Sequence, residues 1–266
     1  MTTSAGYRPL VPELVTLHVW GVPPGRVLQA AAAMARDRRP VAQAPGRTFH
    51  KLLGTGTGAT FTPKDADPRH WALLVCWSDA RAADGFERSD VVRRWDARAA
   101  GPGGERLRIA LTPLSSRGRW DERQPFGEPD PGPAPAARPG TYDGPVAALT
   151  RARLRPSRTP EFWRAVPAVS ARLRDAPGLM TSLGIGEAPV GRQGTFSLWD
   201  SVAALEAFAY RTPEHRSVIA ATARVGWYAE ELFARFAVAE ARGTLRGLDL
   251  EVGSGSDSDM GTRNVT

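Results

Sequence analysis

The sequence predicts an α+β protein in which two tandem ferredoxin-like β-α-β-β-α-β repeats pack sheet to sheet as a pseudo-dimeric α+β barrel. WALLVCWSDARAADGF (71–86) and RQGTFSLWDSVAALEAF (192–208) share one pattern: an alternating apolar run, a Trp, a polar break and a helix that ends in Phe. The spacing is fixed, because Trp77 and Trp199 lie 122 residues apart, as do Phe86 and Phe208. Strand and helix signals also follow the same order in both copies.

The first copy shows six elements in this order. It opens with the strand LVTLHVWGV and the helical stretch GRVLQAAAAMAR, and continues with the strands KLLGTG and WALLVCW, a helix that ends at Phe86 and the closing strand RLRIALTPLSS. The strands are recognised by their apolar residues, which alternate with a period of two in the closing strand. Because helices cover one face of such a sheet, its other apolar face needs a partner.

The second copy supplies that partner. Its elements are the strand PVAALTRARL, the helix TPEFWRAVPAVSARLR, the strands SLGIGE and QGTFSLW, a helix that ends at Phe208 and the closing strand ELFARFAVAEA. Gly54 and Gly56 of the first copy match Gly184 and Gly186 of the second. No Lys-Ser or Lys-Thr follows them as in a phosphate-binding loop. The glycines therefore predict a bulge or a close approach of two backbones.

The composition of the remaining segments sets the domain boundaries. The first repeat spans 10–118, a linker 119–144, the second repeat 145–247 and a tail 248–266. The linker contains the run EPDPGPAPAARPG, which is too rich in Pro and Gly to build a core of its own. The tail EVGSGSDSDMGTRNVT is polar and rich in Gly and Ser, so we expect it to be disordered.

Composition excludes several functional classes for this chain of 266 residues. The net charge is +7, but Lys occurs only at Lys51 and Lys64 and the arginines are scattered, so we expect no nucleic-acid partner. No run of about 18 apolar residues predicts an integral membrane span. The first residues lack the features of a signal peptide, so we expect a cytoplasmic protein. Cys76 is the single cysteine and lies opposite Leu198 in the repeat, which favours a small buried apolar residue.

His215 is the first candidate for a metal ligand. It lies in AFAYRTPEHRSVI (207–219), where Thr212 suits an N-cap and Pro213 suits the first helical position. This would place His215 on the first turn of a helix, where the helix dipole favours neutral imidazole, the form that binds a metal. The alternative is an exposed helix residue without a function.

His18 is the second candidate, because its strand could point it into the barrel. The alternative for His18 is a core histidine whose hydrogen bonds are satisfied. His50, at the start of a strand, and His70, in an inserted loop, are expected to be structural. No pair of histidines has the spacing of a helical zinc site.

Four motifs carry a family resemblance. They are KLLGTGTGATFTPKDADPRHWALLVCW, PLSSRGRW, MTSLGIGEAPVGRQGTFSLWDS and HRSVIAATARVGWYAEELFARFAV. Together they resemble the spheroidene monooxygenase family of carotenoid-modifying oxygenases. The resemblance covers most of residues 14–247 and leaves out the linker and the tail.

The resemblance implies a b-type haem protein that uses O2 and an external electron donor to oxygenate a carbon of an apolar polyene, and a reductant of ferredoxin type is the candidate donor. In related haem proteins of this fold, including aldoxime dehydratases, a His on the corresponding helix is similar in placement to the axial iron ligand, which implies that role for His215. His18 is then the candidate for the distal, catalytic side. Haem propionates need cations, for which Arg192, Arg117 and Arg119 are the candidates.

Two alternatives stay open beside oxygenation. A haem site on this fold can also catalyse another type of reaction on a small polar substrate, such as aldoxime dehydration or nitrogen-group chemistry. The barrel can also bind haem or an apolar ligand without turnover. The sequence leaves the oligomeric state open.

Overall fold

The computed structural model describes residues 11–60, 62–127, 142–188, 191–211 and 226–253. The strands are β1 (Leu14–Gly21), β2 (Arg47–Gly56), β3 (Ala66–Trp77), β4 (Glu105–Gly118), β5 (Val146–Leu154), β6 (Leu179–Gly186), β7 (Arg192–Trp199), β8 (Tyr228–Leu245) and β9 (Leu248–Val252). The helices are α1 (Val27–Arg36), α2 (Arg38–Ala42), α3 (Ala80–Glu87), α4 (Asp90–Ala99), α5 (Thr159–Arg174) and α6 (Val202–Arg211). Short 3-10 turns lie at Pro24–Arg26, Pro63–Asp65 and Pro156–Arg158.

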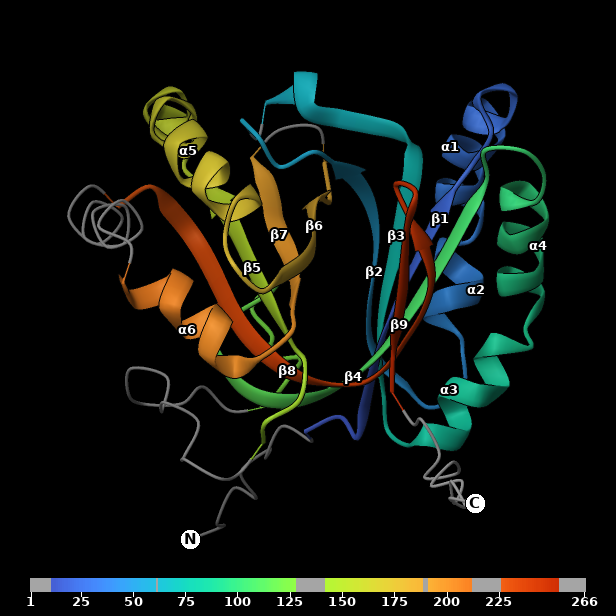
Figure 1. The fold of residues 1–266 in the computed structure, drawn as a ribbon. Coiled ribbons are helices and arrows are strands. Elements are labelled where there is room, and N and C mark those ends of the chain that lie inside the picture. The colour runs from blue at the N-terminus through green and yellow to red at the C-terminus, as the bar shows by residue number, and fades with distance from the viewer. Residues whose placement is uncertain (1–10, 61, 128–141, 189–190, 212–225, 254–266) are drawn as a thin grey trace, which may run out of the picture.

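Eight antiparallel strands close into a barrel in the order β4-β1-β3-β2-β6-β7-β5-β8, and β8 pairs back with β4. Each copy contributes four neighbouring strands, β4-β1-β3-β2 from the first copy and β8-β5-β7-β6 from the second. In both copies the fourth strand thus lies beside the first, followed by the third and the second. The helices of the first copy lie outside β1 and β3, and α5 and α6 lie on the opposite side of the barrel (Figure 1). The predicted pseudo-dimeric α+β barrel is therefore confirmed, and the two sheets are joined at their edges as well as facing each other.

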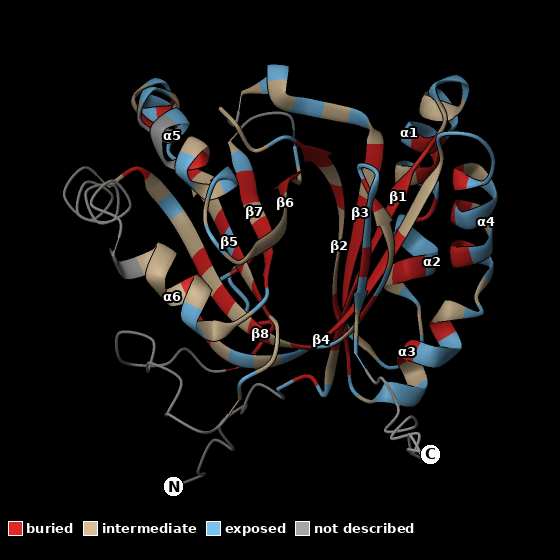
Figure 2. Ribbon diagram, in the orientation of Figure 1, coloured by how far each residue is buried: buried red, intermediate tan, exposed pale blue. Residues whose placement is uncertain are grey.

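Side chains from both copies fill the barrel interior. Val15, Leu17 and Val19 of β1 meet Phe196 and Phe236 of the second copy in one buried cluster. Residues of β1, β3 and β7 are mostly buried, and buried and half-buried residues alternate along the middle of β8 (Figure 2). An eight-stranded barrel is just wide enough for side chains to fill it, so this interior is a packed core.

Cys76 belongs to the same interior cluster, as its match with Leu198 predicts. Burial raises the pKa of its thiol well above the ordinary value, which keeps the thiol protonated. Cys76 therefore behaves as a small apolar residue.

The two junctions between the copies differ in length. The β4–β8 ladder runs from Leu107 to Gly118, whereas the β2–β6 ladder contains only Gly54–Gly186, Thr55–Ile185 and Gly56–Gly184. A Cβ at Gly184 would lie 2.9 Å from the backbone nitrogen of Gly58 and 3.0 Å from the carbonyl oxygen of Gly56. The close backbone approach that the paired glycines predict is therefore present at this junction.

Three segments differ from the expectation. Ser89 caps an additional helix, α4, because its hydroxyl accepts a hydrogen bond from the Val92 N–H. The start of the expected linker contributes Trp120 and Phe126 to the barrel core. Residues 248–252, expected to be disordered, form β9 on β8. Among the described residues, no helix is both long and apolar enough to cross a membrane.

Candidate functional site

The outward side of the first sheet is filled by large side chains. We call the set Thr16, His18, Trp20, Trp71, Leu73 and Val75 the first outer face. The side chains of β1 and β3 on this face pack with Phe86 of α3 and Trp95 of α4 in a second buried cluster. Trp20 stacks on Trp95 with ring centroids 5.2 Å apart. The helices of the first copy therefore close directly onto the sheet.

The same positions in the second copy carry small or polar side chains. Leu14 pairs with Trp77 in the first copy as Val146 pairs with Trp199 in the second, which fixes the equivalent positions. The second outer face, defined in this way, consists of Ala148, Thr150, Ala152, Gln193, Thr195 and Ser197. Ala152 thus stands where the first copy has Trp20, and Thr150 stands where it has His18. Thr150 is exposed although it lies in the middle of β5, so this sheet is covered less completely.

Gln193 and Ser197 are buried polar residues of the second outer face, and Ser197 accepts a hydrogen bond from Trp199. The side chain of Gln193 is 8% exposed, and its Nε2 has no hydrogen-bond partner among the described residues. A buried donor that lacks an acceptor costs about 1–3 kcal/mol, so such groups usually face a ligand or an ordered water. The face therefore combines side chains that are smaller than those of the first outer face with an unmatched donor.

Arg117 lies at the edge of the same face. It pairs with Phe233 across the β4–β8 junction, and its guanidinium lies 5.0 Å from the centre of the Phe233 ring. Phe233 in turn is the strand partner of Thr150. The exposed Arg117 thus lies in the row of side chains that crosses the second outer face.

A pocket of about 610 Å³ opens where β5 ends and where β7 and β8 begin. We call it the rim pocket; its walls include Arg153, Leu154, Thr159, Trp163, Arg192 and Ala229. Arg192, a predicted propionate partner, therefore lies beside the start of α5. Arg119 is exposed after β4, and its guanidinium donates to the carbonyl of Glu122, 3.3 Å away.

His18 lies on the first outer face, on the side of the sheet opposite to the interior residues Leu17 and Val19. Its ring stacks on Trp20 at 5.4 Å, with an angle of 8° between the planes. The sequence hypothesis assumed that this strand turns His18 toward the barrel interior, and the structure gives the opposite orientation.

The hydrogen bonds of His18 specify a neutral imidazole. Arg106 donates to Nδ1 from 3.2 Å, so the ring proton lies on Nε2, which is 3.2 Å from the hydroxyl of Thr16. Burial, followed by the charges of Arg106 and Arg108, holds the pKa of His18 well below its ordinary value. The carboxylate of Glu87 lies 3.6 Å from Nδ1, but its negative charge does not outweigh burial and the two arginines.

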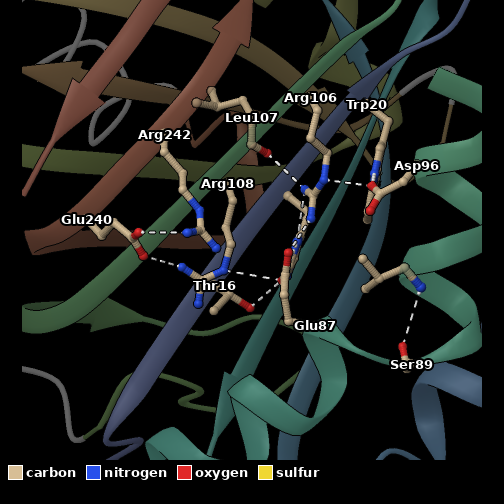
Figure 3. Close-up of polar contacts among 12 residues, drawn as sticks. Thr16, Trp20, Glu87, Ser89, Asp96, Arg106, Leu107, Arg108, Glu240 and Arg242 are labelled. Atoms are coloured by element: carbon tan, nitrogen blue, oxygen red, sulfur yellow. Dashed lines mark hydrogen bonds and ion pairs between the residues drawn. The ribbon is translucent and has the colours of Figure 1, made fainter. Parts of the chain in front are cut away.

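The arginines around His18 are themselves paired. Arg106 bonds to Glu87 and to Asp96, each at 2.7 Å, and Arg108 approaches Glu87 at 3.3 Å. Figure 3 shows these side chains converging on Glu87 beside Thr16. This network accounts for His18 as a histidine whose hydrogen bonds are satisfied.

The other histidines are placed differently. His70 lies between Asp67 and Glu105, with ring nitrogens 2.7 and 2.6 Å from their carboxylates. His50 borders a cationic pocket that also contains Lys51; burial, followed by the charges of Arg47, Lys51 and Arg123, lowers its pKa to about 4. His215 lies outside the described residues. Among those that the structure describes, no three His, Cys, Asp or Glu side chains are grouped to hold a metal ion.

Sequence reasoning missed Arg153, Trp163 and Gln193. A residue-by-residue comparison of the two copies in strand register would have pointed to this region. In that register, Ala152 is equivalent to Trp20 and Gln193 to Trp71, so the outer face of the second copy carries smaller side chains. The offset that aligned the helices does not give this register, because the first strands of the two copies lie at a different spacing.

Comparison with known structures shows the same fold in aldoxime dehydratase. One such structure matches with a TM-score of 0.59 and 16% identity, covering 85% of this chain and 80% of that chain. Another, an aldoxime dehydratase in complex with butyraldoxime, matches with a TM-score of 0.58 and 14% identity, covering 85% and 79%. At this level of identity, the likeness is one of fold alone.

Sequence comparison identifies the family. No protein-family model matches the chain. The chain is 40% identical over 217 residues to the spheroidene monooxygenase of Rhodobacter capsulatus, covering 81% of this chain and 86% of that protein. It is 35% identical over 248 residues to the spheroidene monooxygenase of Rubrivivax gelatinosus, covering 92% and 88%. The resemblance of the four motifs is thereby confirmed, and the chain belongs to the spheroidene monooxygenase family.

Proposed function

We propose that this protein is a haem-dependent monooxygenase that inserts oxygen from O2 into an apolar, carotenoid-like molecule, with electrons from an external donor. The observation that carries the proposal is the 40% identity over most of the chain to a protein named spheroidene monooxygenase. The fold shared with aldoxime dehydratase agrees with a barrel of this type.

The second outer face is the place that fits a haem. A porphyrin is flat and apolar, and it needs a volume that side chains do not fill. On β5, the smaller side chains of Ala148, Thr150 and Ala152 stand where the first copy has Thr16, His18 and Trp20, so we place the porphyrin over them. The unmatched donor of Gln193 and the cation of Arg117 border it, as a ligand with polar edges requires.

The roles of single residues follow from this placement. His215, which lies outside the described residues, is proposed as the axial ligand, as the family resemblance implies. Arg117, Arg119 and Arg192 are the proposed cations for the two propionates. His18 faces the helices of the first copy, so we assign it no contact with this site.

When bound, haem supplies the activation of O2, and the protein positions the substrate. Phe233 offers an apolar contact to a polyene, which helps to exclude water from its reacting carbon. Gln193 can donate a hydrogen bond to an oxygen atom at this face. No described residue of this face carries an acid that titrates near neutral pH, so proton delivery is assigned to none of them.

The proposal is tested by spectrum and turnover. Purified protein with added hemin should show an intense haem band, and it should convert spheroidene only when both O2 and a reductant are present. Protein that remains colourless with hemin would reject the haem, and turnover without O2 would favour a redox-neutral reaction. His215→Ala should shift or abolish the band.

Ala152→Trp tests the location. This substitution restores on the second copy the side chain that fills the first copy, so it should weaken hemin binding at least tenfold while the protein still folds. Ala32→Trp, at an exposed position of α1, is the control and should bind hemin like the unmodified protein. Equal hemin binding by both variants would place the haem elsewhere.

A further inference from the structure

We propose that the rim pocket is a carboxylate-binding site built from Arg153, Arg192 and Trp163. The inference rests on the proposed function only for the source of the carboxylate, which is then a propionate of the haem. The pocket itself is inferred from its unmatched hydrogen-bond donors, from two arginines that have no described carboxylate at ion-pair distance and from the helix end that faces it.

Buried donors without acceptors gather around this pocket. Arg153 Nε and Trp163 Nε1, both of wall residues, have no hydrogen-bond partner among the described residues. Gln193 Nε2 and Trp227 Nε1 also lack a partner among the described residues, but these two residues do not line the pocket. Because each unmatched donor costs about 1–3 kcal/mol, the two donors of the pocket wall favour a ligand that carries acceptors.

The nearby carboxylates are engaged elsewhere. Glu187 bonds to Arg151 at 2.7 Å and to Lys51 at 2.8 Å. Glu230, the strand partner of Arg153, bonds to Arg151 and also accepts from two backbone N–H groups. Within the part of the chain that the structure describes, neither Arg153 nor Arg192 has a carboxylate at ion-pair distance. Arg192 acts on Asp121 at longer range, since its charge helps to lower the pKa of that carboxyl. The two guanidinium groups therefore have no described carboxylate in direct contact.

The N-terminal end of α5 adds to the positive potential. Thr159 and Pro160 begin this helix of 16 residues and line the pocket, and the N-cap residue Arg158 makes no side-chain hydrogen bond to the free N–H groups. The first turn of a helix favours an anion.

The walls select a carboxylate on an apolar arm. Leu154, Pro156 and the ring of Trp163 stand beside the two guanidinium groups. The planar fork of Arg matches the two oxygens of a carboxylate. A haem propionate has this chemistry, and so does the acid group of a separate small molecule.

The experiment compares hemin with hemin dimethyl ester, which has the same porphyrin without free carboxylates. Dissociation constants are measured from the visible spectrum for the unmodified protein and for Arg153→Gln, Arg192→Gln and Trp163→Phe. Arg164→Gln is the control, because this exposed arginine follows Trp163 but does not line the pocket. A thermal melt of each variant checks that it folds.

A propionate in the pocket predicts that Arg153→Gln and Arg192→Gln each weaken hemin binding by about tenfold. Trp163→Phe, which removes one N–H, should weaken it less. The dimethyl ester should bind equally to all variants, and Arg164→Gln should bind both porphyrins like the unmodified protein. Hemin affinities that are equal in all variants would exclude a propionate.

A separate acid predicts a different result. Benzoate, but not benzamide, should then raise the melting temperature of the unmodified protein, and Arg153→Gln should abolish that shift. If the protein binds neither porphyrin, the proposed function fails, and the benzoate experiment alone then tests whether the pocket binds a carboxylate. Equal porphyrin affinities together with no benzoate effect would overturn the inference.

Discussion

At the scale of single residues, His18 shows why a histidine in a strand is hard to interpret. Apolar residues occupy both sides of β1, since Val15, Leu17 and Val19 enter the barrel and Trp20 packs under the helices. Alternation therefore identifies the strand but does not say which side is the interior. The neighbouring arginines, which hold the ring neutral, come from β4 and are distant in sequence.

The titration of His18 gives a prediction about stability. The unfolded chain binds a proton at this residue below about pH 6.5, whereas the native chain does not, because the native pKa is lower. The unfolded state thus binds more protons, and the free energy of unfolding falls as the pH drops, by about 1.4 kcal/mol per pH unit from this group. In urea denaturation, the free energy of unfolding should fall more steeply with decreasing pH for the unmodified protein than for His18→Gln. His50, whose pKa is also lowered, contributes a slope of the same sign to both proteins.

NMR provides the control for this prediction. The ring of His18 should not titrate near pH 6.5. His70 should titrate above it, since its hydrogen bonds to Asp67 and Glu105 outweigh the effect of burial and raise its pKa. The contribution of His70 to stability is therefore present below about pH 6.5 and is lost as the pH rises through its native pKa. A normal titration of His18 would contradict the assignment.

At the scale of elements, the strands were the part of the fold that the sequence predicted best. Alternation and the repeat spacing identified both sets of four strands. Helix α4 was missed although Ser89 is a standard N-cap signal, because the repeat pattern predicts a single helix, ending at Phe86, between β3 and β4. Trp120, Phe126 and β9 were missed because their Pro-, Gly- or Ser-rich surroundings suggest chain without a core, while their burial depends on strands far away in sequence.

The candidate site was predicted only in part. The motif resemblance gave the family and pointed to Arg192 and Arg117, which the structure places at the rim pocket and at the edge of the second outer face. Gln193 and Trp163 could not be assigned, since a buried donor without an acceptor is visible only when all its neighbours are known.

The short β2–β6 ladder gives a prediction about backbone contact. Gly184→Ala places a Cβ 2.9 Å from the backbone nitrogen of Gly58, so the strands must separate, at a cost of about 1–3 kcal/mol. Gly54→Ala is the control within the same ladder, because its nearest contact is 3.8 Å away. Urea denaturation should show a lower midpoint for Gly184→Ala alone. Equal midpoints would mean that this junction is not tightly packed.

At the scale of the whole molecule, each copy binds the last turn of the other. Glu230 of β8 accepts the N–H groups of Asp121 and Glu122, which follow β4, from 3.1 and 2.9 Å. Glu105 of β4 accepts those of Arg246 and Gly247, which follow β8, from 2.9 and 2.6 Å. All four turn residues have positive φ angles, so both turns have a similar backbone form.

Glu230 gives a prediction about barrel closure. Glu230→Gln removes one of the charges that pair with the buried Arg151. Arg151 keeps its bond to Glu187, so the loss should be about 1.5–3 kcal/mol, as for a hydrogen bond to a charged group. Glu231→Gln, the same change at the next residue, should alter stability by less than about 0.5 kcal/mol. Urea denaturation of both variants is the measurement, and similar midpoints would refute the role of Glu230 in closing the barrel.

The pH range of this contribution follows from the pKa of Glu230. Burial would raise that pKa, but the N–H groups of Glu122 and Asp121 and the charge of Arg151 outweigh burial and lower it. The stabilisation is therefore present above the unfolded pKa, about 4.3, and is lost as the pH falls through the native value.

The exchange of turns between the copies also bears on how such a chain can evolve. In a symmetric pair of identical ancestral subunits, one glutamate and one turn would have served both contacts. After fusion, each contact depends on two sites in different halves of the gene. A change in either half is then constrained by the other half. This holds although the two outer faces have diverged, since large side chains fill the first and smaller or polar side chains form the second.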